Sequence, residues 1–194
     1  MEVSSKVVVI GGSWGGIQAS LNILGRLPAN YSVPIILVLH RLRNYEGNLQ
    51  EVFGKRLALR AVEVEEKEAL LPGHLYLAPA NYHVLLENDH TFSLDDSELE
   101  NYSRPAIDVT FTSAAGVFGR DTIGILLSGA SRDGSLGLLR IFEKGGTTIV
   151  QHPKEAEVDT MPSAAIEVVP ACSVLSLEQI EAFLLSLHDQ RSTP

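Results

Sequence analysis

The chain opens with the pattern that most restricts its fold: a short apolar run, a glycine turn and then helical periodicity. Residues 7–10 read Val-Val-Val-Ile, and a run of β-branched residues is typical of a parallel strand buried on both faces. Residues 11–16 read Gly-Gly-Ser-Trp-Gly-Gly, and apolar residues recur at helical spacing from Ile17 onward. This order places Ser13 at the carboxyl edge of a sheet, beside a helix N-terminus, where open α/β sheets bind ligands.

The glycine loop is first compared with a dinucleotide-binding fingerprint. The pattern Gly11-x-Ser13-x-x-Gly16 has serine where the second glycine of G-x-G-x-x-G lets the backbone approach a pyrophosphate. No acidic ribose ligand ends the next predicted strand. Arg41 and Arg43 stand there instead, and they would suit the phosphate of NADP, so this interpretation is weakened but stays open.

Two further interpretations compete for the same loop. Gly11-x-Ser13-x-Gly15 fits the nucleophile elbow G-x-S-x-G, a tight turn that presents a reactive serine. Alternatively, the glycines serve only strand-to-helix packing and Ser13 caps the helix. Short glycine motifs arise often by chance, so the rest of the chain has to decide.

Composition limits the class of protein. A chain of 194 residues suits a single domain, spanning residues 1–194, with a substantial core. The net charge of −9 argues against a nucleic-acid binder, which needs clustered Lys and Arg. One cysteine, Cys172, fits a reducing compartment, and no apolar run is long enough to cross a membrane. We therefore expect a cytoplasmic protein that is not membrane-embedded.

Apolar runs and helical patterns alternate along the chain. Strands are predicted around residues 33–40, 61–64, 74–79, 122–127, 147–150 and 172–175, and a hairpin over 83–94. A helix is predicted from Ser103 with Pro105 in its first turn, and Ser176 with Gln179 forms a capping box for the last helix. The alternation predicts a doubly wound, Rossmann-like three-layer α/β fold with a mostly parallel sheet and one antiparallel hairpin.

Three residues with the chemistry of a hydrolase follow directly on predicted buried strands. Ser13, His40 and Asp133 share the carboxyl edge of the sheet, so their side chains can converge. A serine hydroxyl needs a base, an imidazole acts near neutral pH, and a carboxylate fixes the imidazole tautomer. Backbone N–H groups at Trp14 and Gly15 could bind the oxyanion. The α/β-hydrolase fold is disfavoured, because its triad runs in the order Ser, acid, His.

Each of these residues also has a purely structural interpretation. His40 could bond a backbone carbonyl, and Asp133 could cap the helix that follows it. His83 is the rival base, since it also lies near a turn. The remaining histidines lack metal-ligand spacing with Cys or acidic partners, so no metal site is predicted.

Several segments, in order, resemble the catalytic domain of the chemotaxis protein-glutamate methylesterase (CheB) family. They are residues 10–16 (IGGSWGG), 39–40 (LH), 71–79 (LPGHLYLAP), 103–109 (SRPAIDV), 127–134 (LSGASRDG) and 161–162 (MP). The resemblance implies hydrolysis of glutamate γ-methyl esters on chemoreceptor helices with release of methanol, and deamidation of receptor glutamines as a second activity. It further implies Ser13 as nucleophile, His40 as base, Asp133 as orienting acid, and no metal or organic cofactor.

The chain departs from the family pattern at three points. Trp14 replaces the threonine that usually follows the serine, and Ala130 and Ser131 replace a methionine-glycine pair before the aspartate. Trp14, Gly15 and Ala130 are therefore candidates for the oxyanion site or the pocket wall. The receiver domain that usually precedes this domain is absent from the sequence. We expect a stand-alone form, either constitutive or governed by a separate receiver or histidine-kinase signalling protein.

The sequence leaves two other functions open. The same triad could act on another ester or amide, which a pocket narrowed by Trp14 would favour. The chain could also be a catalytically silent signalling-binding module, although the three triad residues argue against it.

Overall fold

The computed structural model describes residues 5–40 and 48–189, and its centre is a parallel sheet. Within these residues the sheet has seven strands in the order β3-β4-β2-β1-β7-β8-β9, and every pair is parallel. The strands are β1 (Val7–Gly12), β2 (Ile35–Leu39), β3 (Arg60–Glu63), β4 (His74–Leu77), β7 (Thr122–Leu126), β8 (Thr147–Gln151) and β9 (Ser173–Leu175). The predicted fold class is confirmed.

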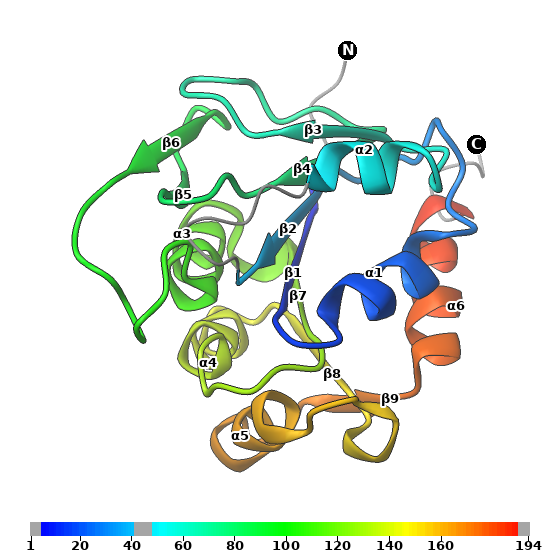
Figure 1. Cartoon of the computed structure of the whole chain (residues 1–194), viewed down its shortest axis with the longest axis vertical. Helices are drawn as coiled ribbons and strands as arrows, with labels where there is room; N and C mark the ends of the chain where they lie inside the picture. Colours follow the sequence, from blue (N-terminus) through cyan, green and yellow to red (C-terminus); the bar gives the residue numbers. More distant parts are fainter. Residues whose placement is uncertain (1–4, 41–47, 190–194) are drawn as a thin grey trace.

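Helices cover both faces of the sheet. They are α1 (Gly16–Leu24), α2 (Leu49–Gly54), α3 (Ile107–Phe118), α4 (Ser135–Glu143), α5 (Thr160–Val168) and α6 (Leu177–Asp189), with 3₁₀ turns η1 (Gly119–Asp121) and η2 (Pro153–Glu155). Figure 1 shows α1 and α6 on one side of the sheet and α3 and α4 on the other. The predicted hairpin is also confirmed: β5 (His83–Leu86) pairs antiparallel with β6 (Phe92–Asp95).

Alternate residues of the central strands point into two separate cores. Val8 and Ile10 of β1 belong to the core under α1, α2 and α6, whereas Val7 and Val9 belong to the core under α3, α4, α5 and the hairpin. All four side chains are fully buried. Burial on both faces explains why β1 is continuously apolar rather than alternating.

The strand order reverses at β1, which has β2 on one side and β7 on the other. Gly12 is in register with Leu39 of β2, and Gly11 is in register with Leu126 of β7. The segments that follow these three strands therefore leave the sheet at the same edge. In open α/β sheets this switch point is where ligands bind.

The helix predicted from Ser103 starts later than expected, so this prediction is wrong. Ala106 is the N-cap, with extended backbone (φ −107°, ψ 138°), and α3 begins at Ile107. Pro105 lies outside the helix, after a cis peptide bond. The reason is tertiary: the carboxylate of Asp133 accepts the N–H groups of Ile107 and Asp108, which fixes the first turn there.

The capping box at the start of α6 is confirmed, because Ser176 and Gln179 exchange side chain-to-backbone hydrogen bonds at 2.9 and 3.1 Å. In the part of the chain that the structure describes, no helix combines the length and the apolar character that crossing a membrane requires.

Candidate active site

Ser13 follows β1 directly and is held by its backbone. Its N–H donates to the carbonyl of Ser128 at 2.9 Å, and its carbonyl accepts the N–H of Gly16 at 2.8 Å. Helix α1 is capped by Gly15, without a side-chain hydrogen bond. The alternative in which Ser13 caps the helix is therefore wrong. Among the described residues, no hydrogen bond to the Ser13 hydroxyl is seen.

Ser128, in the segment that follows β7, fixes the loop that carries Ser13. The Ser128 hydroxyl donates to the carbonyl of Trp14 at 2.8 Å and accepts the N–H of Val158 at 2.9 Å. Gly15 has φ +78°, and a Cβ there would lie 2.8 Å from the Glu157 Cβ, so only glycine fits. The loop is thus tied to two neighbouring segments before any substrate binds.

The candidate oxyanion groups lie on two segments that meet at Ser13. A Cβ on Gly129 would be only 2.9 Å from the Ser13 Cβ, which places the segment after β7 against the serine. Within residues 5–40 and 48–189, the N–H groups of Trp14, Gly15 and Ala130 have no acceptor. Unpaired N–H groups beside a helix N-terminus suit a developing negative charge.

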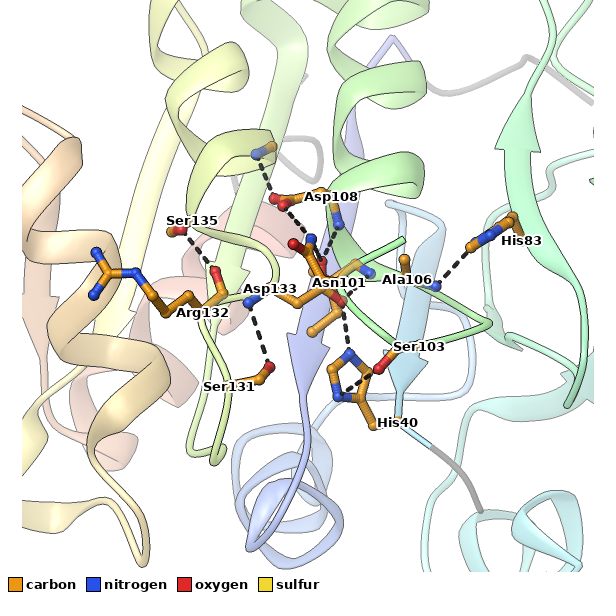
Figure 2. Close-up of polar contacts among 12 residues, drawn as sticks. His40, His83, Asn101, Ser103, Ala106, Asp108, Ser131, Arg132, Asp133 and Ser135 are labelled. Carbon is orange, nitrogen blue, oxygen red and sulfur yellow. Dashed lines mark hydrogen bonds and ion pairs between the residues drawn. The ribbon is translucent and has the colours of Figure 1, made fainter. Parts of the chain in front are cut away.

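His40 and Asp133 form the polar centre of the site (Figure 2). His40 Nε2 lies 2.6 Å from Asp133 Oδ2. Asp133 is fully buried, and its two oxygens also accept N–H groups from Ile107 at 2.7 Å, Asp108 at 3.0 Å and the Asn101 side chain at 3.0 Å. Four donors fill the acceptor capacity of a carboxylate.

These donors keep Asp133 ionised. Burial by itself raises the pKa of Asp133, but the hydrogen bonds from His40 and from the backbone of Ile107 and Asp108 outweigh it, and the net pKa lies below its usual value. A carboxylate can only accept, so His40 donates its Nε2–H to Asp133. The lone pair is then on Nδ1, which is the basic atom of the ring.

Ser13 and His40 lie side by side at the ends of β1 and β2. Ser13 follows Gly12 and His40 follows Leu39, and Gly12 and Leu39 are paired in the sheet. The His40 N–H donates to the Gly12 carbonyl at 3.2 Å, so the hydrogen bonding between the two strands continues as far as His40. Neighbouring strands are about 4.8 Å apart, so the two residues lie on adjacent segments at the same edge of the sheet. The structure nevertheless places another hydroxyl at Nδ1: Ser103 Oγ, at 3.4 Å.

Three residues near the site were not foreseen as site residues: Asn101, Ser103 and Asp108. Asn101 Nδ2 donates to Asp133 Oδ1 at 3.0 Å and to Asp108 Oδ2 at 2.9 Å, so its amide bridges the two carboxylates. Burial and the nearby Asp133 charge raise the pKa of Asp108 to about 6. Ser103 and Asp108 belong to the 103–109 segment that carries the family resemblance, and Asn101 lies two residues before it, but no pattern in the sequence marked any of the three as a site residue.

Trp14 extends from the serine loop into solvent. It is 67% exposed, and its Nε1–H donates to Glu157 Oε1 at 2.7 Å. The indole is therefore fixed by a partner on the segment before α5 rather than buried against α1. This geometry suits a side chain that lines the approach to Ser13.

His83, the rival candidate for the base, has both ring nitrogens in hydrogen bonds to the backbone. It is almost completely buried, its Nδ1 accepts the N–H of Ala106 at 3.1 Å, and its Nε2 donates to the carbonyl of Glu98 at 3.0 Å. Figure 2 shows its ring bonded to the backbone at Ala106. Because both ring nitrogens are hydrogen-bonded to the backbone, His83 holds the segment that leads into α3 in place.

Two other expectations concern cofactors. Arg41 and Arg43, weighed as ligands for NADP, lie outside the described residues. In the described parts of the chain, no group of three or more His, Cys, Asp or Glu side chains is arranged to hold a metal ion.

Comparison with known proteins identifies a family whose members resemble this chain. The family model described as CheB methylesterase matches residues 8–184. A relative from Leptospira interrogans is 42% identical over 182 residues, and the alignment covers 94% of each chain. A protein-glutamate methylesterase/protein-glutamine glutaminase from Chromohalobacter salexigens is 36% identical over 185 residues, which is 94% of this chain and 52% of that relative.

The fold has a close counterpart among solved structures. The crystal structure of the CheB methylesterase catalytic domain from Thermotoga maritima aligns with a TM-score of 0.90 at 34% identity, covering 95% of this chain and all of that domain. Residues 8–184, which the family model matches, include the glycine loop, both strand ends beside it and the segment that carries Asp133.

Proposed function

Because the chain belongs to the CheB methylesterase family, we propose that it is a carboxylic ester hydrolase that removes γ-methyl groups from glutamates of chemoreceptors. Ser13 is the nucleophile, His40 the base and Asp133 the acid that orients His40. The segment 11–16 is then a nucleophile loop rather than a dinucleotide site.

The observation that carries this proposal is the hydrogen bond of 2.6 Å between His40 Nε2 and the buried Asp133. It fixes the tautomer that leaves Nδ1 as acceptor, and it places the negative charge where it stabilises an imidazolium. The proposed mechanism requires the Ser13 side chain to rotate so that its hydroxyl reaches Nδ1, and the two residues follow paired positions of neighbouring strands. Hydrogen bonds of this kind often form only when substrate is bound.

In the first half-reaction, His40 Nδ1 takes the proton of Ser13 while Oγ attacks the ester carbonyl. The oxyanion of the tetrahedral intermediate accepts N–H groups from Trp14, Gly15 or Ala130. The imidazolium then gives its proton to the methoxy oxygen, the C–O bond breaks, and methanol leaves an acyl-serine.

In the second half-reaction, His40 takes a proton from water, which attacks the acyl-serine. Collapse of this intermediate returns the proton to Ser13 Oγ and releases the glutamate side chain. A glutamine substrate follows the same route with ammonia as the leaving group, which accounts for a glutaminase activity of the same site.

The test is methanol release from a chemoreceptor fragment carrying labelled methyl esters. We expect release by the wild type and a loss of at least about 10³-fold in Ser13→Ala, the scale at which removal of a triad member acts. Circular dichroism and thermal melting establish that the variant is folded. Release that persists in folded Ser13→Ala would overturn the role of Ser13. A folded wild type that releases no methanol would overturn the proposed substrate.

A further inference from the structure

The most exposed aromatic side chain of the described residues stands next to the site. Tyr102 is 97% exposed and has a left-handed backbone (φ 62°), as does Asn101 before it (φ 52°). These two are the central residues of a tight turn, in which Glu100 and Ser103 exchange backbone hydrogen bonds at 3.2 and 2.9 Å. Two consecutive positive φ values are typical of a type I′ turn.

The backbone conformation of this turn is unfavourable for tyrosine. Asn is readily accommodated in the left-handed region, but the second central position of a type I′ turn is normally occupied by glycine. A bulky side chain there costs conformational free energy. Its ring is almost entirely in solvent, so burial in this chain does not offset the cost. Strained residues of this kind occur preferentially at ligand-contacting sites.

The turn is tied to the active site on both sides of Tyr102. Asn101 donates to Asp133 at 3.0 Å and to Asp108 at 2.9 Å, and Ser103 Oγ lies 3.4 Å from His40 Nδ1 (Figure 2). Adjacent Cα atoms are 3.8 Å apart, so Tyr102 has one neighbour that touches the catalytic carboxylate and one that touches the base. Its backbone position is therefore fixed relative to the reacting atoms, while its ring projects outward.

We propose that Tyr102 is a specificity-determining residue that contacts the protein substrate beside the modified glutamate. This inference rests on the proposed function, and it names the surface that distinguishes a receptor from a small ester. On a helical substrate the residues three and four positions from the glutamate lie about 5–6 Å from it on the same face. An outward aromatic ring next to the site reaches these neighbours, whereas a small ester held at Ser13 does not extend that far.

Aromatic side chains are suited to such contacts, because they bury a large area with few rotatable bonds. Trp14, 67% exposed on the serine loop, is a second aromatic within one residue of a proposed site residue. Two exposed aromatics on two segments that adjoin the triad favour a substrate with an extended surface of its own.

The experiment compares two substrates: a methyl-esterified receptor fragment and the γ-methyl ester of a capped single glutamate. For Tyr102→Gly we expect the ratio of kcat/KM on the receptor to kcat/KM on the small ester to fall about tenfold, mainly through KM on the receptor. The Tm should not fall, because glycine adopts the left-handed conformation without strain. Tyr102→Asn removes the ring but keeps a residue suited to the turn. We expect its ratio of kcat/KM values to fall as much as that of Tyr102→Gly.

The matched control is Val174→Ala, which shortens an exposed apolar side chain of the edge strand β9. For Val174→Ala, the ratio of kcat/KM on the receptor to kcat/KM on the small ester should match that of the wild type. A wild-type ratio in both Tyr102 variants, with the receptor still hydrolysed, would overturn the role of Tyr102 alone. Hydrolysis of the small ester without any hydrolysis of the receptor by the wild type would overturn the proposed substrate, and the role of Tyr102 with it.

Discussion

At the scale of single residues, Asp133 combines two functions that the sequence presents as alternatives. The sequence allowed it to be either the acid of a triad or the cap of the helix that follows it. It bonds His40, but the helix it caps is α3, which precedes it in the chain. The partial positive charge of a helix N-terminus thus stabilises the carboxylate that the proposed mechanism needs ionised.

Asp108 is the residue whose charge state should respond to pH. Its pKa is raised to about 6 by burial and by Asp133, whereas in the unfolded chain it has its ordinary value of 3.8. Between these values the folded protein binds a proton that the unfolded chain does not, so this group stabilises the fold at low pH. Its contribution is lost as pH rises through 6.

We therefore expect the free energy of unfolding of the wild type, relative to Asp108→Asn, to fall by on the order of 2 kcal/mol between pH 4 and pH 7.5. Urea unfolding of both proteins at several pH values measures this difference, and groups common to both cancel. The pKa of Asp133 is lowered from 3.8, so the contribution of Asp133 to the free energy of unfolding changes with pH below 3.8, outside the range from pH 4 to pH 7.5. A difference that stays constant with pH would show that Asp108 does not titrate there.

At the scale of elements, α3 and α4 are linked by two carboxylates, each of which accepts backbone N–H groups of the other helix or of its first turn. Asp133, just before α4, accepts N–H groups at the start of α3, and Asp108 of α3 accepts the N–H of Gly137 in α4 at 2.6 Å. The helices approach closely at Gly137, where a Cβ would lie 2.6 Å from the Phe111 Cβ and 3.0 Å from the Asp108 Cα. The position of Asp133 therefore depends on the packing of two helices.

Gly137→Ala tests this coupling. Alanine favours a helix, but the overlap with α3 should outweigh that preference and destabilise the protein by about 1–3 kcal/mol. The kcat should fall as well, because the amides of Ile107 and Asp108 move relative to Asp133. Urea unfolding and the methanol assay measure the two effects.

The matched control is Gly116→Ala in α3, where a Cβ would meet nothing within 4 Å. We expect this variant to be more stable by about 0.5–1 kcal/mol with its activity kept. Equal effects of the two substitutions on stability and activity would contradict a specific contact between α3 and α4.

At the scale of the whole molecule, much of the architecture could be predicted because it depends on local patterns. Continuous apolar runs such as residues 7–10 predicted buried strands, and their alternation with helices predicted the layers. The positions of Ser13, His40 and Asp133 after strands of this sheet were predictable from the same apolar runs. The start of α3 was not, since it depends on a carboxylate 25 residues further along the chain.

Asn101, Ser103 and Tyr102 illustrate the same limit within the site. No strand end or helical period predicts their positions, because the turn that holds them is fixed by contacts with His40, Asp108 and Asp133. Such residues become visible only when the tertiary structure places the turn against the sheet edge.

In the proposed mechanism Ser13, activated by His40, is the nucleophile, although the structure places Ser103 Oγ 3.4 Å from the basic nitrogen of His40. The most direct measurement is covalent labelling with an alkyl fluorophosphonate, followed by peptide mass spectrometry of the wild type, Ser103→Ala and His40→Ala. We predict a single phosphonyl group on Ser13 in the wild type and in Ser103→Ala, and at least about 10³-fold slower labelling in His40→Ala. Labelling of Ser103 with Ser13 unmodified, or labelling of Ser13 at the wild-type rate without His40, would contradict it.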